Sequence, residues 1–225
     1  MNEGYQRMRR LLMVGWMALV WAGGSMAQTE SVSGPVLTID HFHTALTDMA
    51  MRADELGYTG RFQRIRPAVE ETFDLEFMAL KSLGRDARSL SPDQRSEWIE
   101  TFSDFVAANW ARQFDGWSNY EFESQGVEDA PRETRIVKTR LVRPDDDDVK
   151  LHYRLREVAR SDGEPGEETG SGEENTSGSS WRIIDVYSNG TVSELALRRS
   201  EFSSLFAREG FDSLMKTVRA KVDSE

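Results

Sequence analysis

The sequence predicts an α+β domain in which helices come first, an antiparallel sheet follows, and a last helix packs on that sheet. Between residues 37 and 116, apolar residues recur at intervals of three and four, the period of amphipathic helices. From Tyr120 to Leu155 the period changes to two, as in strands with one face in water. The stretch 181–214 then predicts a strand, a tight turn and a helix. Apolar residues on both elements allow them to close on one interior.

The first 27 residues have the pattern of an export signal. Arg7, Arg9 and Arg10 precede the apolar run 11–22, and small residues follow it. We expect cleavage after Ala27. The apolar run is about half as long as a membrane-spanning helix requires, so a permanent anchor is the less favoured alternative.

The exported chain is acidic and contains no cysteine. Removing residues 1–27 takes away three arginines and one glutamate, which lowers the formal net charge from −11 to −13. Such a charge argues against nucleic acid and against direct docking on anionic lipid headgroups. Without cysteine we expect neither disulfides nor an acylated N-terminal cysteine. Contact with a membrane would therefore run through protein partners.

Two helical segments are expected before residue 74. One runs from Leu37 to a stop near Gly57, and the other begins at Pro67, which suits the first turn of a helix. His41 and His43 are two residues apart, so they point to different sides of the first helix and are not expected to share a metal ion. We expect both on the solvated surface.

Local start and stop signals define two more helices. Asp74 can cap a segment 75–82 that Gly84 ends. Residues 91–94 combine a capping Ser, a Pro at the first helical position and a Gln at the third, so a long helix should run from there to Gly116. The apolar stripe of this helix is mostly aromatic and consists of Trp98, Phe102, Phe105, Val106, Trp110 and Phe114.

The sheet region contains two polar connections. Residues 144–148 carry four aspartates but lack the spaced ligands and the closing Glu of a calcium loop, so a solvated hairpin tip is expected. Residues 161–180 are rich in Gly, Glu, Ser and Thr and contain no large apolar residue. We expect them to form a flexible acidic loop between two paired strands.

The C-terminal stretch has its own turn and cap signals. Asn189-Gly190 favours a left-handed bend, Thr191 with Glu194 forms a capping box, and Gly210 stops the helix. One strand face is expected to carry Trp181, Ile183 and Tyr187. The matching helical stripe is expected to carry Val192, Leu195, Phe202, Leu205 and Phe206.

The residues offer little material for catalysis. The chain has three histidines, no cysteine, no G-x-S-x-G motif, no metal-ligand spacing and no phosphate-binding glycine loop. Strand alternation places Asp185 inward, either as the base of a small-molecule enzyme beside Tyr153 and Tyr187 or as half of an ion pair with Arg198 or Arg199. The ion pair is preferred because buried carboxylates are normally paired. A third alternative is a structural or partner-binding exported domain with a solid core.

Short motifs in a fixed order resemble a known family. They are F-D-L-E-F-M-A at 73–79, L-G at 83–84, S-P-D-Q-R at 91–95, W-R-x-x-D-V at 181–186, S-E-L-A-x-R-R-S-E-F at 193–202 and E-G-F-D-S-L at 209–214. Together they resemble the periplasmic lipid-binding proteins called MlaC, or Ttg2-type toluene-tolerance auxiliary proteins. The motif at 193–202 is similar to a subgroup associated with hopanoid lipids.

The resemblance implies a fold, a function and partners. The fold would be a four-stranded antiparallel curved sheet wrapped by helices, partly like the cones of nuclear-transport-factor type, with an apolar lipid pocket in residues 28–225. The protein would be no enzyme and need no cofactor. It would carry phospholipid through the periplasm between an outer-membrane lipoprotein complex and an inner-membrane ABC transporter with an MCE-type ring subunit, maintaining the lipid asymmetry of the outer membrane.

The lipid-binding prediction depends on a cavity between the apolar faces of the sheet and of its covering helices. Ten residues are predicted to contact acyl tails because each is expected on an inward face. They are Phe73, Met78, Phe102, Phe105, Trp110, Tyr153, Tyr187, Val192, Phe202 and Leu205.

Overall fold

The computed structural model describes residues 34–116, 120–144, 146–159 and 179–224. The chain divides into two units at residue 31, and all described residues belong to the second, which is compact. The predicted signal segment 1–27 and nearly all of the predicted acidic loop 161–180 lie outside the described residues, so both stay predictions. Within the described residues, no helix has both the length and the apolar character needed to cross a membrane.

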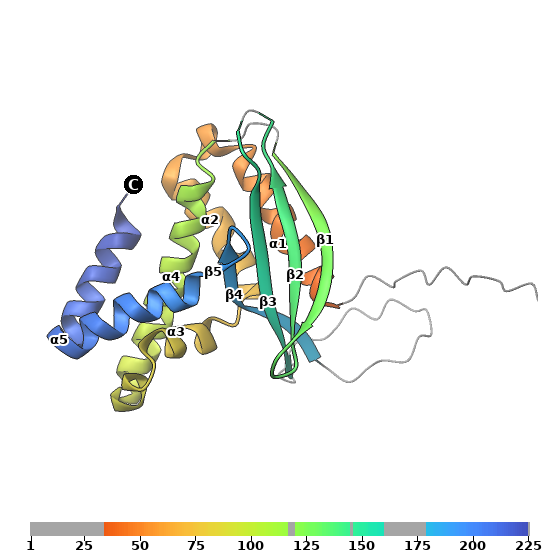
Figure 1. Cartoon of the computed structure of the whole chain (residues 1–225). Coiled ribbons are helices and arrows are strands. Elements are labelled where there is room, and N and C mark those ends of the chain that lie inside the picture. The colour runs from red at the N-terminus through yellow and green to blue at the C-terminus, as the bar shows by residue number, and fades with distance from the viewer. Residues whose placement is uncertain (1–33, 117–119, 145, 160–178, 225) are drawn as a thin grey trace, which may run out of the picture. The chain divides into compact units, whose positions relative to one another are not determined.

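The second unit has the predicted α+β architecture. Its elements in chain order are α1 (Gly34–Ala50), α2 (Ala53–Thr72), α3 (Leu75–Leu83), a short 3₁₀ turn η1 (Asp86–Ser89), α4 (Pro92–Gln113), β1 (Glu121–Ala130), β2 (Thr134–Val142), β3 (Val149–Ala159), β4 (Ser179–Ser188), β5 (Val192–Ser193) and α5 (Glu194–Asp223). The helices gather on one side of the sheet (Figure 1).

The strands form one antiparallel sheet in the order β1-β2-β3-β4-β5. It has five strands rather than the predicted four, because Val192 and Ser193 turn back and pair with the end of β4. The predicted left-handed bend makes this return, since Asn189 and Gly190 have φ angles of 53° and 76°. At the β2–β3 hairpin, Asp146, Asp147 and Asp148 are exposed, as expected for a solvated tip.

The local cap signals of α3 and α4 are confirmed. The Asp74 carboxylate accepts a hydrogen bond of 3.1 Å from the Phe77 amide, and Gly84 ends α3 with a φ of 63°. At the start of α4 the Gln94 amide donates to Ser91 Oγ at 3.2 Å, while the Ser91 amide donates to the Gln94 side chain at 3.0 Å. These caps fix where the aromatic helix begins.

Two of the predicted helix boundaries are wrong. The first helix ends at Ala50, and Gly57, with a φ of 57°, is a kink inside α2 rather than a stop. Pro67 does not begin a helix, since α2 starts fourteen residues earlier, at Ala53. A proline there removes one backbone hydrogen bond. The buried side chains of Ile65 and Val69, on the same helix, keep α2 packed across that gap.

The start of α5 also differs from the prediction. Ser193, rather than Thr191, caps the helix, and its Oγ accepts a 3.0 Å hydrogen bond from the Ala196 amide. The shift arises because residues 192–193 are used by β5. Gly210, with a φ of 83°, interrupts α5 as predicted and divides it into two helical parts.

Candidate functional site

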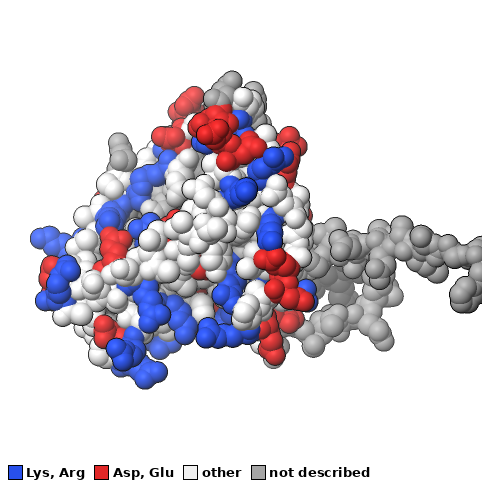
Figure 2. Space-filling view, viewed as in Figure 1, with Lys and Arg blue, Asp and Glu red and all other residues white. Residues whose placement is uncertain are grey.

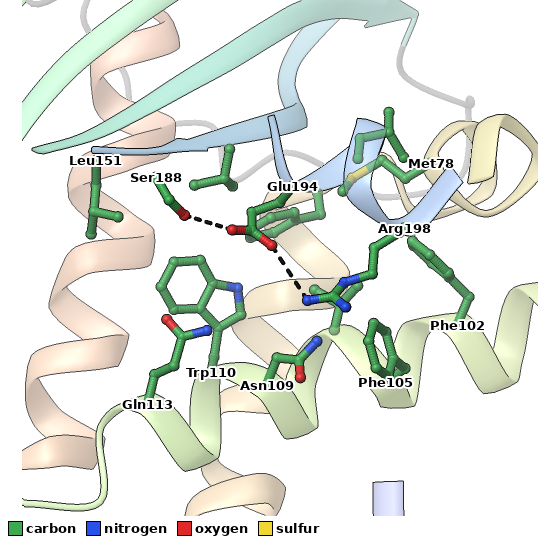
Figure 3. A pocket seen from close by; sticks show the side chains of 14 residues that line it. Met78, Phe102, Phe105, Asn109, Trp110, Gln113, Leu151, Ser188, Glu194 and Arg198 are labelled. Carbon is green, nitrogen blue, oxygen red and sulfur yellow. Dashed lines mark hydrogen bonds and ion pairs between the residues drawn. The ribbon is translucent and has the colours of Figure 1, made fainter. Parts of the chain in front are cut away.

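A cavity of about 70 Å³ lies between the helix-covered face of the sheet and helices α3, α4 and α5. Figure 3 shows its side chains converging from these elements. The lining residues are Phe73, Met78, Phe102, Phe105, Val106, Asn109, Trp110, Gln113, Leu151, Val186, Ser188, Glu194, Leu195 and Arg198.

One helix supplies most of the apolar wall. Phe102, Phe105, Val106 and Trp110 follow one another at intervals of three, one and four along α4, so they share one helical face, and all are buried. The opposite wall comes from β3 and β4, and Met78 of α3 contributes a flexible side chain. The site is therefore apolar on both sides.

The cavity also has a polar rim formed by Asn109, Gln113, Ser188, Glu194 and Arg198. Ser188 Oγ at the end of β4 donates a 2.6 Å hydrogen bond to Glu194 Oε1 at the start of α5. The Arg198 guanidinium lies 3.4 Å from the other Glu194 oxygen and 5.1 Å from the centre of the Phe105 ring (Figure 3). These contacts connect β4 to the first turns of α5 across the rim.

The Arg198 contacts continue along α5. Its guanidinium also lies 3.1 Å from Glu201, whose second carboxylate oxygen is 2.9 Å from Lys221. The last pair joins the two helical parts of α5 across Gly210. Both carboxylates are therefore paired, and the pKa of Glu201 is lowered because the hydrogen bonds and charges of Lys221 and Arg198 together outweigh its desolvation.

The structure brings five of the ten predicted residues to the cavity: Phe73, Met78, Phe102, Phe105 and Trp110. Tyr153 and Phe202 are fully buried in the neighbouring core but do not line it. Val192 is 43% exposed on β5, and Tyr187 and Leu205 are partly exposed outside the cavity. The role of the residues as acyl-chain contacts stays a prediction, whereas the inward position expected for Val192 and Tyr187 is wrong.

A β-bulge explains the position of Tyr187. Ile183 pairs with Leu155 and Asp185 pairs with Arg154, so Ile184 is an extra residue on β4. The alternation of faces is shifted from there on, and Val186, not Tyr187, lines the cavity. Sequence alternation alone gives the opposite result because it assumes an uninterrupted strand.

Asp185 is buried but does not pair with Arg198 or Arg199, so that prediction is wrong. Its carboxylate accepts hydrogen bonds from the Val186 amide at 2.9 Å, from Ser193 Oγ at 2.6 Å and from the Leu195 amide at 3.0 Å. Desolvation raises the pKa of Asp185, and these hydrogen bonds partly offset the rise. The carboxylate thus joins β4, β5 and α5.

The arrangement required for an enzyme based on Asp185 is not assembled. The bulge turns Asp185 toward the face of Arg154, while Tyr153 lies on the helix-covered face of the sheet. There Tyr153 shares a 3.0 Å hydrogen bond with His43 Nε2. In the described part of the chain, no three His, Cys, Asp or Glu side chains are placed to hold a metal ion.

The predicted surface position of His43 is also wrong. It is only 7% exposed and stacks on Phe122 with ring centres 3.8 Å apart, whereas a solvated position was expected. Burial lowers the pKa of His43 to about 3, so the imidazole is neutral at physiological pH. The signal was present in the sequence, because residue 43 continues the stripe of Ile39, Phe42 and Leu46. His41 is exposed and 3.2 Å from Glu71.

Sequence analysis did not predict the polar rim as part of the site. Asn109 and Gln113 follow Phe102, Phe105 and Trp110 on the same side of α4, so helical periodicity contained the information. Leu151 lies on the same face of β3 as Tyr153, so strand alternation could have predicted its place at the cavity. The positions of Val186 and Ser188 could not be predicted because of the bulge in β4. The position of Arg198 depends on the shifted start of α5.

Helices on one side of an antiparallel sheet, with an apolar cavity between the layers, are the arrangement of proteins that bind apolar ligands. The sequence model of the family described as MlaC protein matches residues 42–164 and 173–220, about three quarters of the chain. The protein therefore belongs to the MlaC family. No curated protein matches the sequence.

A solved structure shares the fold. It is the phospholipid-binding protein from Ralstonia solanacearum, determined in complex with a phospholipid. The alignment has 13% sequence identity and a TM-score of 0.66, and it covers 84% of this chain and 97% of the other. The similarity over nearly the whole of that protein confirms the predicted fold class, although the strand count differs.

Proposed function

We propose that the protein is a periplasmic carrier that binds phospholipid by its acyl chains. The observation that carries this proposal is the apolar cavity between α4 and the sheet, in a chain of the MlaC family whose fold matches a phospholipid-binding protein. The predicted export signal supports a periplasmic location. The hydrocarbon would lie against Phe102, Phe105 and Trp110, with the headgroup at the polar rim.

The physical task of such a carrier is to keep hydrocarbon out of water. Exposing two acyl chains with about thirty methylenes would cost on the order of 20 kcal/mol, at about 0.8 kcal/mol for each methylene. A protein that crosses an aqueous compartment with this cargo needs an apolar enclosure and no catalytic group. The cavity walls supply that enclosure, and the cargo itself is the only small molecule that the function requires.

The cavity must enlarge to hold a lipid. Its volume is about 70 Å³, whereas ligand pockets typically have about 300–1,000 Å³. The first part of α5 is the wall held by the fewest buried side chains, since Phe202 is the only buried residue before Gly210. We expect the middle of this part, around Phe202, to shift away from α4 with Gly210 as the flexible point, while Asp185 holds its first turn to β4. Leu214 and Val218 keep the second part in place.

The resemblance to MlaC proteins supports a specific route. We propose that the carrier exchanges phospholipid with an inner-membrane ABC transporter complex that has an MCE-type ring subunit and with an outer-membrane lipoprotein complex. This exchange would maintain the lipid asymmetry of the outer membrane. The motif at 193–202 supports the alternative that the cargo is a hopanoid-type lipid.

Mass spectrometry of an organic extract tests the proposal. The purified mature protein should release phospholipid at about one molecule per chain, and a hopanoid in its place would assign the chain to the other lipid class. Val106→Trp, which fills the cavity from α4, should greatly reduce the extracted lipid. Val158→Trp, a matched change on a partly exposed residue outside the cavity lining, should not. Lipid-free wild-type protein, or equal lipid in both folded variants, would contradict the proposal.

A further inference from the structure

A second hollow, of about 440 Å³, lies on the other side of the β4–α5 junction from the cavity. We call it the cationic groove, because five cationic side chains line it: Lys81, Arg132, Arg154, Arg156 and Arg199. They come from α3, the β1–β2 turn, β3 and α5. Figure 2 shows Lys and Arg gathered on the lower part of this face, where α3 and the start of α5 meet the sheet.

The positive charge of the groove is not neutralised from within. Of the described residues that line it, Asp185 alone carries a carboxylate, whose oxygens already accept three hydrogen bonds. Arg156 is paired with Asp74 at 2.6 Å. Among the described residues, Lys81, Arg132 and Arg199 have no carboxylate within ion-pair distance. This concentration of cations occurs in a chain whose formal net charge is −11.

Three of the five cationic side chains make contacts within the groove that position them. Arg154 donates to Thr134 Oγ1 at 2.9 Å and to the Pro131 carbonyl at 2.8 Å. The Arg156 guanidinium lies 4.5 Å and the Lys81 ammonium 5.2 Å from the centre of the Phe77 ring. Clustered like charges repel one another, and an anionic ligand would relieve this repulsion.

The shape and the surroundings of the groove select the kind of anion. The groove is concave and has apolar surface from Phe77 and the nearly buried Ile184, so it suits a chain with both acidic and apolar side chains. A flat anionic bilayer fits it poorly, and the net charge of the protein opposes such a contact. A headgroup of lipid in the cavity is also disfavoured, because Asp185 and Val186 place the two hollows on opposite faces of β4.

We propose that the cationic groove is the docking site for an acidic peptide segment of a partner protein. This rests on the proposed function in that a carrier must dock on its donor and its acceptor. Leu195, in the first turn of α5, lines both the groove and the cavity. An occupant of the groove therefore contacts the part of α5 whose displacement enlarges the cavity.

The test measures binding of a fluorescein-labelled peptide of alternating Glu and Leu to the full mature protein, by fluorescence anisotropy. In the groove variant, Lys81→Gln, Arg132→Gln and Arg199→Gln are combined, because all three side chains are exposed and unpaired among the described residues. Loss of three exposed charge contacts should weaken binding about tenfold or more. Raising the salt concentration should also weaken binding to the wild type, because salt screens the attraction between the groove and the peptide.

The control variant combines Lys150→Gln, Arg208→Gln and Lys216→Gln, which are exposed elsewhere and give the same change in net charge. It should bind the peptide within about twofold of wild type. A peptide with Gln in place of Glu should not bind. Equal losses in both variants, no binding by the wild type, or stronger groove-dependent binding to phosphatidylglycerol vesicles than to the peptide would overturn the proposal.

Lipid content separates this proposal from the proposed function. The groove variant should release as much lipid on organic extraction as the wild type, since none of its three substitutions lines the cavity. Loss of lipid from a folded groove variant would show that the groove belongs to the lipid site and would overturn the docking proposal. A lipid-free wild type that still binds the acidic peptide would contradict only the carrier function.

Discussion

Moderate acidification is expected to destabilise the protein through His43. The side chain is buried against Phe122 and Tyr153, and its pKa is about 3 in the folded chain, compared with about 6.5 in an unfolded one. The unfolded state therefore takes up a proton at a higher pH than the folded state. The stability from neutral His43 is complete above about pH 6.5 and is lost as the pH falls toward about 3.

The magnitude follows from the difference between the two pKa values. Each pH unit below about 6.5 removes about 1.4 kcal/mol from the free energy of unfolding. Relative to about pH 7.5, the loss from His43 is about 1.4 kcal/mol at pH 5.5 and about 2.7 kcal/mol at pH 4.5. The range above about pH 5.5 is the most informative, because ordinary carboxylates change little there.

Urea unfolding of the wild type and of His43→Gln, at about pH 7.5 and pH 5.5, measures this contribution. The variant should be less stable at neutral pH but should lose about 1.4 kcal/mol less on acidification. Burial also lowers the pKa of His152, which adds a loss of the same sign in every variant. His41→Gln, a change at an exposed position on the same helix, is the matched control. An unchanged pH dependence in His43→Gln, or an NMR titration of His43 near pH 6.5 in the folded protein, would refute the reasoning.

Three further substitutions test the packing around the site. Phe202→Ala should lower the free energy of unfolding by about 3–5 kcal/mol, because this fully buried ring packs edge-on against three aromatic rings of α4; a loss below about 1 kcal/mol in urea unfolding would contradict that packing. Gly84→Ala should cost about 1–2 kcal/mol in the same assay, since a φ of 63° is unfavourable with a side chain, and a neutral result would place Gly84 outside the left-handed region. Asp185→Ala should cost about 2–4 kcal/mol by leaving the Val186 and Leu195 amides without an acceptor; normal stability with lost lipid binding would instead indicate a functional carboxylate.

The elements that were predictable from the sequence are those fixed by residues close together in the chain. Asp74 and residues 91–94 form their caps within one helical turn, so their residue types are sufficient to locate the starts of α3 and α4. The aromatic face of α4 follows in the same way from its 3.6-residue period. Three of the five predicted acyl-chain contacts that line the cavity, Phe102, Phe105 and Trp110, lie on this face.

The features that were missed depend on residues far apart in the sequence. The bulge at Ile184 is a feature of the pairing between β4 and β3, and nothing in the order of residues 183–187 distinguishes a bulged strand from a regular one. Thr191 matched a capping pattern, but pairing of residues 192–193 with β4 moved the cap to Ser193. The cationic groove likewise joins side chains from four separate elements.

The small volume of the cavity has a consequence for the stability of the chain. A rigid empty void of roughly 400 Å³ between the same walls would cost on the order of 10 kcal/mol, comparable to the whole stability of an ordinary domain. At about 70 Å³ the cavity incurs only a small part of this penalty, because its aromatic walls lie close to one another. Under the proposed carrier function, contacts that form between these walls as the lipid leaves would favour its release.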